Sequence, residues 1–184
     1  MSELAGLWLP ILVSAVAVFF ASFLAWVVIG HHTPDWNELP EEGDTIDQLR
    51  KSGIKPGMYM FPMLRTKEAM ASDVKQQRMT SGPWGTVNIW SRQVSMPRNL
   101  VQSFLFYMVT SFFIAYLGTL ALEPGADFLK VFQVTGTAGI LAYAFGVVPN
   151  AIWFGTHCRP LLMDIIDGVC FGLITGAVFG MLWS

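Results

Sequence analysis

The chain has 184 residues, of which 53% are hydrophobic and only 13% are charged, and its mean hydropathy is +0.50. This composition excludes an ordinary soluble domain and indicates a protein with several membrane spans. The formal net charge of −2 excludes a strongly basic chain, so nucleic acid is not an expected partner. Only Cys158 and Cys170 are present, and Cys170 lies within an apolar run, so a disulfide framework has no support.

Four apolar runs are each near or above the roughly 20 residues that cross the hydrocarbon core of a bilayer. They cover residues 4–30, 101–122, 131–148 with a continuation to 154, and 161–183. None alternates in polarity as the strand of a membrane barrel does. No Lys or Arg precedes the first run, so we expect it to be a retained span and not a signal peptide. The sequence therefore predicts an all-α membrane protein with four transmembrane helices, one over 1–30 and three over 99–184.

The distribution of basic residues predicts the orientation in the membrane. Nine of the eleven Lys and Arg residues fall in the polar segment 31–98, between the first and second runs. Positive charge is retained on the cytoplasmic side of a membrane. We therefore expect residues 31–98 in the cytoplasm, both termini outside, and lipid around a multi-pass protein of the cell (inner) membrane.

The polar segment 31–98 carries the signals of a small α/β insertion. Asp44 is a suitable N-cap for a short helix, and Gly53 suits the left-handed position after its end. The predicted elements are a helix over about 45–52, a strand over 58–61, a helix over 66–79 and a strand over 86–90. The two strands are placed to pair around the second helix. Because about 60 residues form only a small core, we expect this segment to lean on the membrane surface through Trp36, Trp84 and Trp90.

A row of glycines runs through the last apolar run at every fourth residue. It consists of Gly168, Gly172, Gly176 and Gly180. Residues four apart lie nearly above one another on a helix, and small residues there let a second backbone approach closely. We expect the row to pack against the first or third span. A homodimer formed through the same row is the alternative.

The predicted topology brings several polar side chains to one face of the membrane. His31, His32, Asp35 and Glu38 follow the first span, His157 and Cys158 lie between the third and fourth, and Asp164 and Asp167 begin the fourth. Imidazole nitrogen and carboxylate oxygen suit zinc or another divalent transition metal. The candidate metal ligands are His31, His32, Asp35, His157 and Asp164. No spacing among them is a metal signature, so the alternative is a set of polar residues that mark helix ends; no other cofactor is indicated.

Asp164 and Asp167 form a polar pair at the membrane boundary. Three residues apart on a helix, they lie close to one another. Carboxylates at a membrane boundary suit proton or cation exchange. Alternatively, acids in the first turns of a helix that begins near Pro160 interact with its dipole and pair with Arg159 or Arg98.

Two segments carry a resemblance to a known family. They are His32–Glu42, with the pattern HxxDWxxLPxE, and Pro56–Pro62, with the pattern PGxYMFP. The chain resembles a family of uncharacterised bacterial inner-membrane proteins, in which one helix precedes these segments and a half rich in helical hairpins follows. The similarity extends to Ile152–Gly155 and Asp167–Gly168. The resemblance implies the architecture and the membrane, and it implies no activity.

The sequence favours a non-catalytic function. No nucleophile with a nearby base is recognisable, and no acidic or basic residue lies in the middle of a span. We therefore expect an accessory or assembly subunit that binds other membrane proteins or a second copy of itself, and not an enzyme. The alternative is a small transport or metal-handling protein that uses the cluster of histidines and aspartates.

Overall fold

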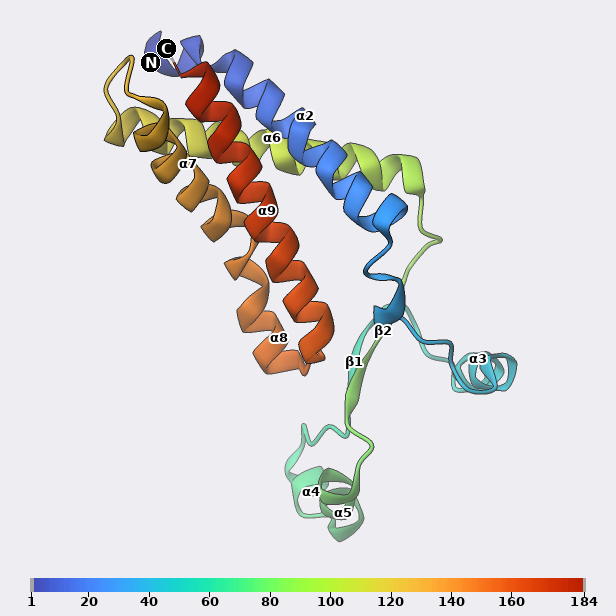
Figure 1. Ribbon diagram of the computed structural model, residues 1–184. Coiled ribbons are helices and arrows are strands. Elements are labelled where there is room, and N and C mark those ends of the chain that lie inside the picture. The colour runs from blue at the N-terminus through green and yellow to red at the C-terminus, as the bar shows by residue number, and fades with distance from the viewer. Residues whose placement is uncertain (1, 184) are drawn as a thin grey trace. The chain divides into compact units, whose positions relative to one another are not determined.

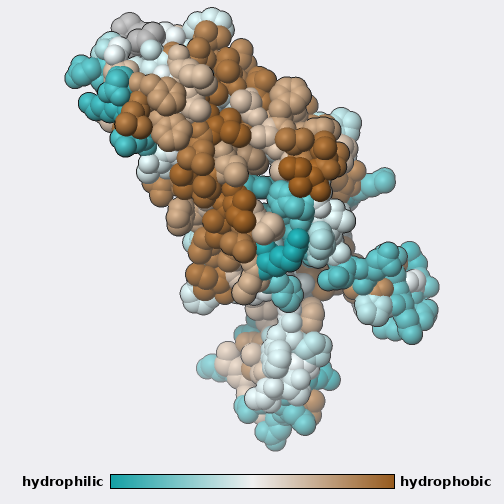
Figure 2. Space-filling model, viewed as in Figure 1, coloured by the Kyte–Doolittle hydropathy of each residue, from teal (hydrophilic) through white to brown (hydrophobic). Residues whose placement is uncertain are grey.

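The computed structural model describes residues 2–183, which form two compact units. The helical unit comprises Met1–Trp36 and Ser95–Ser184, and the insertion unit comprises Asn37–Val94. Four helical segments of the described chain are long and apolar enough to cross a membrane: Trp8–Ile29, Met96–Ala121, Phe128–Phe154 and Cys158–Leu182 (Figure 1). The prediction of a mostly helical protein with four such helices is therefore confirmed. Figure 2 shows that hydrophobic residues cover much of the helical unit on the face in view.

The first span ends in a change of helix type. After the short helix α1 (Ser2–Gly6), helix α2 (Trp8–Phe23) continues as the π-helix η1 (Leu24–Ile29). Gly30 ends this helix in the left-handed region, with φ of 64°, and its N–H donates to the carbonyl of Ala25 at 3.0 Å. Glycine adopts this conformation without the steric cost that a side chain brings. The chain then turns through the 3₁₀ helix η2 (Thr33–Asp35).

The second and third spans differ in continuity. Helix α6 (Met96–Ala121) is unbroken, whereas the third span consists of α7 (Phe128–Tyr143), the 3₁₀ turn η3 (Phe145–Val147) and α8 (Val148–Phe154). Pro149 lacks the N–H that would bond to the carbonyl four residues earlier, so the regular helix is interrupted before it. Gly155, with φ of 68°, then ends α8 and leads into α9 (Cys158–Leu182).

The glycine row of α9 lies against α7, and Figure 1 shows the two helices side by side. A Cβ atom on Gly172 would lie 2.5 Å from the backbone nitrogen of Ile140. The other three glycines are equally close to α7: a Cβ on Gly168 would meet Ala144, one on Gly176 would meet Gly136, and one on Gly180 would meet Phe128. The helices therefore run antiparallel. Of the expected neighbours, the third span occupies this surface, which leaves no room for a homodimer through the same row.

Three hydroxyl groups join three spans inside the helical unit. Ser14 of α2 donates to Thr175 of α9 at 3.2 Å, and Ser111 of α6 donates to Ser14 at 3.3 Å. All three residues are fully buried. Buried polar groups are stable only when hydrogen-bonded, so this network requires the three helices to meet in one register.

The insertion unit contains the predicted hairpin. Strand β1 (Gly57–Phe61) pairs antiparallel with β2 (Gly85–Ile89), with Tyr59 opposite Val87. The single helix expected over 66–79 is instead two helices, α4 (Lys67–Met70) and α5 (Asp73–Ser81). Thr66 is the N-cap of α4, and its hydroxyl accepts the N–H of Ala69 at 3.1 Å.

The start of the first insertion helix differs from the expected one. Helix α3 (Glu42–Lys51) begins three residues before residue 45, and Asp44 lies inside its first turn and not at the N-cap. Glu41 takes the cap position in the left-handed region, with φ of 48°. The hydroxyl of Thr45 donates to the carbonyl of Pro40 at 3.2 Å. This hydrogen bond ties the first turn to the preceding segment and so favours the earlier start.

The unit boundaries also differ from the expected limits of the polar segment, 31–98. Residues 31–36 and 95–98 belong to the helical unit. Residues 31–36 belong to the helical unit because three of their side chains contact α9. His31 and His32 contact Asp167, and Asp35 binds Arg159. Residues 95–98 belong to it because α6 already begins at Met96.

Candidate metal centre

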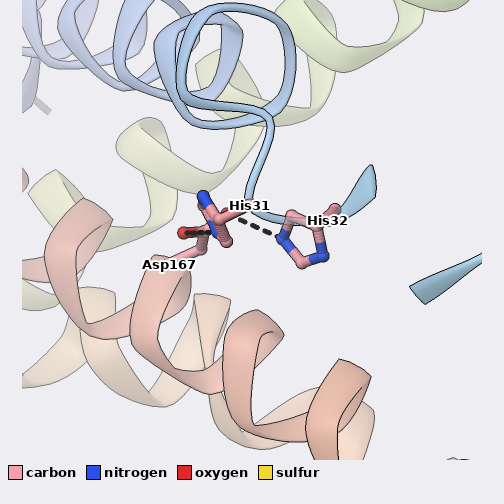
Figure 3. Close-up of side chains that lie close together, drawn as sticks. All are labelled: His31, His32 and Asp167. Carbon is pink, nitrogen blue, oxygen red and sulfur yellow. Dashed lines mark hydrogen bonds and ion pairs between the residues drawn. The ribbon is translucent and has the colours of Figure 1, made fainter. Parts of the chain in front are cut away.

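Two histidines and one aspartate converge where the first span meets the fourth. His31 and His32 directly follow the turn at Gly30, and Asp167 lies on α9 (Figure 3). One ligand atom from each of the three side chains lies within 4.8 Å of the others. The left-handed turn at Gly30 directs the chain from the end of η1 toward α9. Gly168, the neighbour of Asp167, lets α9 pack directly on α7.

Asp167 contacts both imidazole rings with separate oxygens. Its Oδ1 lies 3.0 Å from His31 Nε2, and its Oδ2 lies 3.2 Å from His32 Nε2 (Figure 3). His32 is 3% exposed and Asp167 is 8% exposed, whereas the His31 side chain keeps 22% of its surface accessible. The cluster is therefore largely withdrawn from solvent, with its opening on the His31 side.

The Nε2 atom of His31 lacks a hydrogen-bond partner among the described residues, although it is buried. It lies within ion-pair distance of Asp167 Oδ1, but the two atoms are not aligned for an N–H···O hydrogen bond. A buried polar atom left without a partner costs about 1–3 kcal/mol. A buried ring nitrogen that has no hydrogen-bond partner and lies 3.0 Å from a carboxylate oxygen is suited to bind a cation.

His32 is held on two sides. Its Nδ1 lies 2.9 Å from Asp35 Oδ2, and its ring stacks on Trp26 with centroids 4.0 Å apart and an angle of 11° between the planes. When Nδ1 carries the proton and donates it to Asp35, Nε2 is left with its lone pair directed toward Asp167. A carboxylate that fixes the second nitrogen of a histidine in this way is the usual support of a metal-binding imidazole.

Arg159 connects the start of α9 to the loop after the first span. Its guanidinium binds Asp35 Oδ1 through Nη1 and donates to the backbone carbonyl of His31 through Nη2 at 2.9 Å. The Asp35 side chain is only 5% exposed, so this contact neutralises a carboxylate that water scarcely reaches. With both imidazoles neutral, two carboxylates and one guanidinium leave one net negative charge.

The structure separates the other predicted site residues from this cluster. His157 is exposed at the N-cap of α9, and Glu38 and Cys158 are also exposed. Asp164 is half-buried, with His32, Asp167 and Asp35 as its electrostatic neighbours, but it is not one of the three convergent ligands. Asp35 is bound by Arg159 and supports His32. Arg159 therefore pairs with Asp35, and not with Asp164 or Asp167 as the sequence suggested.

Two contacts of the site were missed in the sequence. Trp26 lies in the π-helix η1 and stacks on His32, which follows the end of that helix. Arg159 was expected to contact an acid of its own helix, and only the folded loop reveals the carboxylate of Asp35. Both contacts depend on the path of the chain after Gly30.

The donor set determines what the cluster can do chemically. Two imidazole nitrogens and one carboxylate oxygen are ligands of zinc and of other divalent first-row metals, and three protein ligands leave a coordination position open. The same three groups can also hold each other directly when an imidazole is protonated, since a protonated ring forms an ion pair with Asp167. A metal centre and a direct ion pair between Asp167 and a protonated histidine are thus the two chemical interpretations of the cluster.

Comparisons with known proteins give no match: no family model, curated protein or solved structure is similar to this chain. The resemblance to uncharacterised bacterial inner-membrane proteins in His32–Glu42 and Pro56–Pro62 therefore stays a prediction. The four apolar helices identify the chain as a candidate multi-pass membrane protein.

Proposed function

We propose that this membrane protein binds zinc or another divalent transition-metal ion through His31, His32 and Asp167. The observation that carries the proposal is the convergence of their ligand atoms within 4.8 Å, in a cluster that includes an unpartnered buried nitrogen on His31. The contact of Asp35 with the second nitrogen of His32 supports it. With both imidazoles neutral, Asp35, Asp167 and Arg159 leave one net negative charge, which a bound cation offsets.

The first test is metal analysis of the purified full chain. The protein in detergent is loaded with zinc, dialysed, and measured by mass spectrometry of the elements. Wild type is expected to retain stoichiometric zinc, and the double variant His31→Ala with Asp167→Asn is expected to lose it. His157→Ala is the matched control, because this third histidine is exposed and outside the cluster. It should bind zinc as wild type does.

A second measurement separates loss of metal from loss of folding. A ligand that binds only the folded protein stabilises it, by about 2.7 kcal/mol at a concentration one hundred times the dissociation constant. Zinc should therefore raise the melting temperature of wild type and of His157→Ala, and leave that of the double variant unchanged. Wild type that retains no zinc, together with a double variant that melts at a lower temperature, would refute the metal centre. The cluster would then be a direct ion pair between Asp167 and a protonated histidine.

We further propose that residues 31–98 face the cytoplasm of a bacterial inner membrane. The nine basic residues of this segment support the orientation, and the family resemblance supports the membrane. Cys158 is an exposed native probe at the expected inner face. In a Cys170→Ser background, an impermeant maleimide should label Cys158 in inverted vesicles and not in intact spheroplasts. The opposite pattern would reverse the topology.

The second candidate function is a non-catalytic accessory or assembly subunit. The observation that favours it lies at one end of the hairpin, where Met58 is 77% exposed and Trp90 is 63% exposed. Apolar side chains left uncovered at one place are typical of a contact surface. On native gels of solubilised membranes, the protein should migrate in a larger assembly, and Met58→Ser with Trp90→Ser should release it. Identical migration of both forms at the size of the single chain would count against this role.

A further inference from the structure

The insertion unit contains a cavity that none of the preceding functions uses. It has a volume of about 350 Å³ and lies between the end of β1 and helix α5. Phe61, Pro62, Met63 and Leu64 form an apolar wall, and Lys75 and Arg78 contribute two cations. It is at the opposite end of the hairpin from Met58, because Phe61 pairs with Gly85 whereas Gly57 pairs with Ile89.

The two cations face the same direction and have no acidic partner. Lys75 and Arg78 are three residues apart on α5, so they lie on one side of that helix. Both residues are exposed, and neither forms an ion pair with any carboxylate of the described chain. Asp73, the acid nearest to Lys75 along the helix, is two residues away and points elsewhere. The cavity therefore presents positive charge that no acidic side chain balances.

The segment around the cavity is also positively charged. Residues 55–94 contain six basic and two acidic residues, which gives a net charge of +4. Trp84, which follows the cavity in sequence, is 64% exposed. The segment is connected at both ends to helices that are long enough to cross a membrane. Basic residues with exposed tryptophan, held next to a membrane, are typical of contact with anionic lipid.

We propose that this cavity binds an anionic phospholipid, with the phosphate between Lys75 and Arg78 and the upper part of an acyl chain against the apolar wall. A free phosphate would use the cations and leave Phe61 and Met63 without a partner. A zwitterionic lipid would use the wall, but its own ammonium group offsets the negative charge that the two cations attract. Connection to the membrane keeps lipid at a high effective concentration, so modest affinity is sufficient. The proposal is independent of the metal centre, which lies in the helical unit.

Native mass spectrometry of the full chain in detergent tests this proposal. The protein is titrated with phosphatidylglycerol and, separately, with phosphatidylcholine. Wild type is expected to bind phosphatidylglycerol more tightly, and Lys75→Gln with Arg78→Gln should weaken that binding about 25-fold, since each basic residue near an anionic surface contributes roughly fivefold. Arg65→Gln with Arg92→Gln is the matched control, because it removes the same charge from the same unit at residues that do not line the cavity. It should bind nearly as wild type does.

Two further arms keep the result interpretable. Lys75→Arg with Arg78→Lys preserves both charges and should retain binding, which would show that the charges, and not the particular side chains, are required. Inorganic phosphate is added as a competitor and should fail to displace the lipid. Equal binding of the two lipids, equal weakening by the control pair, or full displacement by inorganic phosphate would each overturn the assignment of the cavity to an anionic phospholipid.

Discussion

His32 and Asp167 lie 135 residues apart in the sequence, and their side chains approach to 3.2 Å between Nε2 and Oδ2. Two backbone features make this approach available. Gly30 ends the first span in a left-handed turn, and Gly168 allows α9 to lie directly on α7. The candidate metal centre is thus a consequence of helix packing, and disturbing the packing should disturb the site.

The packing of α9 on α7 predicts a strong effect of adding one methyl group. In Gly172→Ala the new Cβ would lie 2.5 Å from the backbone nitrogen of Ile140, and backbone cannot move aside as a flexible side chain can. Overpacking of this kind costs about 1–3 kcal/mol. We expect Gly172→Ala to lower the melting temperature of the protein in detergent and to reduce its zinc content.

Gly146→Ala is the control for this substitution. A Cβ at Gly146 would meet nothing within 4 Å, and Gly146 is not among the glycines with positive φ. Its melting temperature should stay within a degree or two of wild type, since alanine at an open site costs little. If the two variants melted together, α9 would not be in contact with α7 along the glycine row.

The ion pair between Arg159 and Asp35 predicts a measurable coupling. In Arg159→Gln the buried carboxylate of Asp35 loses its charged partner, and the carbonyl of His31 loses a donor. Hydrogen bonds to charged groups contribute about 1.5–3 kcal/mol, and the half-exposed guanidinium favours the lower part of that range. We expect amide exchange to accelerate at Thr33 and Asp35, whose N–H groups hold the turn.

A double-mutant cycle separates this coupling from each residue's own effect. Asp35→Asn combined with Arg159→Gln should destabilise the protein by less than the sum of the two single changes. Strict additivity would show that the two side chains do not interact in the membrane.

The hydroxyl network predicts a small coupling between α2 and α9. Interhelical hydrogen bonds inside membrane proteins contribute on average about 0.6 kcal/mol. Ser14→Ala and Thr175→Val should therefore show a coupling near that value in a double-mutant cycle, measured by unfolding in mixed detergent. Thr119→Val is the control, because the hydroxyl of Thr119 bonds only to the carbonyl of Tyr116 in its own helix. Coupling between Ser14 and Thr119 would contradict the assigned network.

Glu68 supplies a prediction in the insertion unit. The pKa of Glu68 is lowered by its own backbone N–H and by the hydroxyl of Thr66, both of which favour the ionised carboxylate. A lowered pKa means that the contribution to stability is present above the unfolded value and is lost as the pH falls through the folded one. In Thr66→Val the pKa of Glu68 should rise toward its ordinary value in a carbon NMR titration, whereas Thr66→Ser should keep it low. An unchanged titration in Thr66→Val would exclude the hydroxyl contact.

The helices and the hairpin were predictable because their signals are local. Apolar runs of span length predict four helices, and alternation around Met58–Phe61 and Thr86–Trp90 predicts two strands. The structure contains all of these elements. The break within residues 66–79 was missed, although Ser72 is a favoured N-cap residue and takes that position at the start of α5, because helix formers on both sides of it predict one continuous helix.

The sequence predicts only some of the residues that form the cluster. Topology placed His31, His32, His157, Asp164 and Asp167 at one face of the membrane. Of the predicted metal ligands the structure keeps His31 and His32, and Asp167, which was predicted only as a boundary residue, replaces Asp164 as the convergent carboxylate. Which of these side chains meet depends on the π-helical end of the first span and on the turn at Gly30. The separation of Asp35 from the ligand set depends on Arg159, whose partner is 124 residues away in the sequence. Such contacts are tertiary, and no local pattern encodes them.

The most direct test of the metal centre is the X-ray absorption spectrum of the zinc-loaded full chain in detergent. Zinc bound by His31, His32 and Asp167 should have nitrogen or oxygen neighbours at about 2.0–2.1 Å, with the outer-shell scattering of two imidazole rings. In Asp35→Asn the two rings should remain with weaker zinc retention, since Asp35 supports His32 without ligating the metal. A spectrum of zinc with oxygen neighbours and no imidazole scattering would refute the metal centre, because it would place the metal away from His31 and His32.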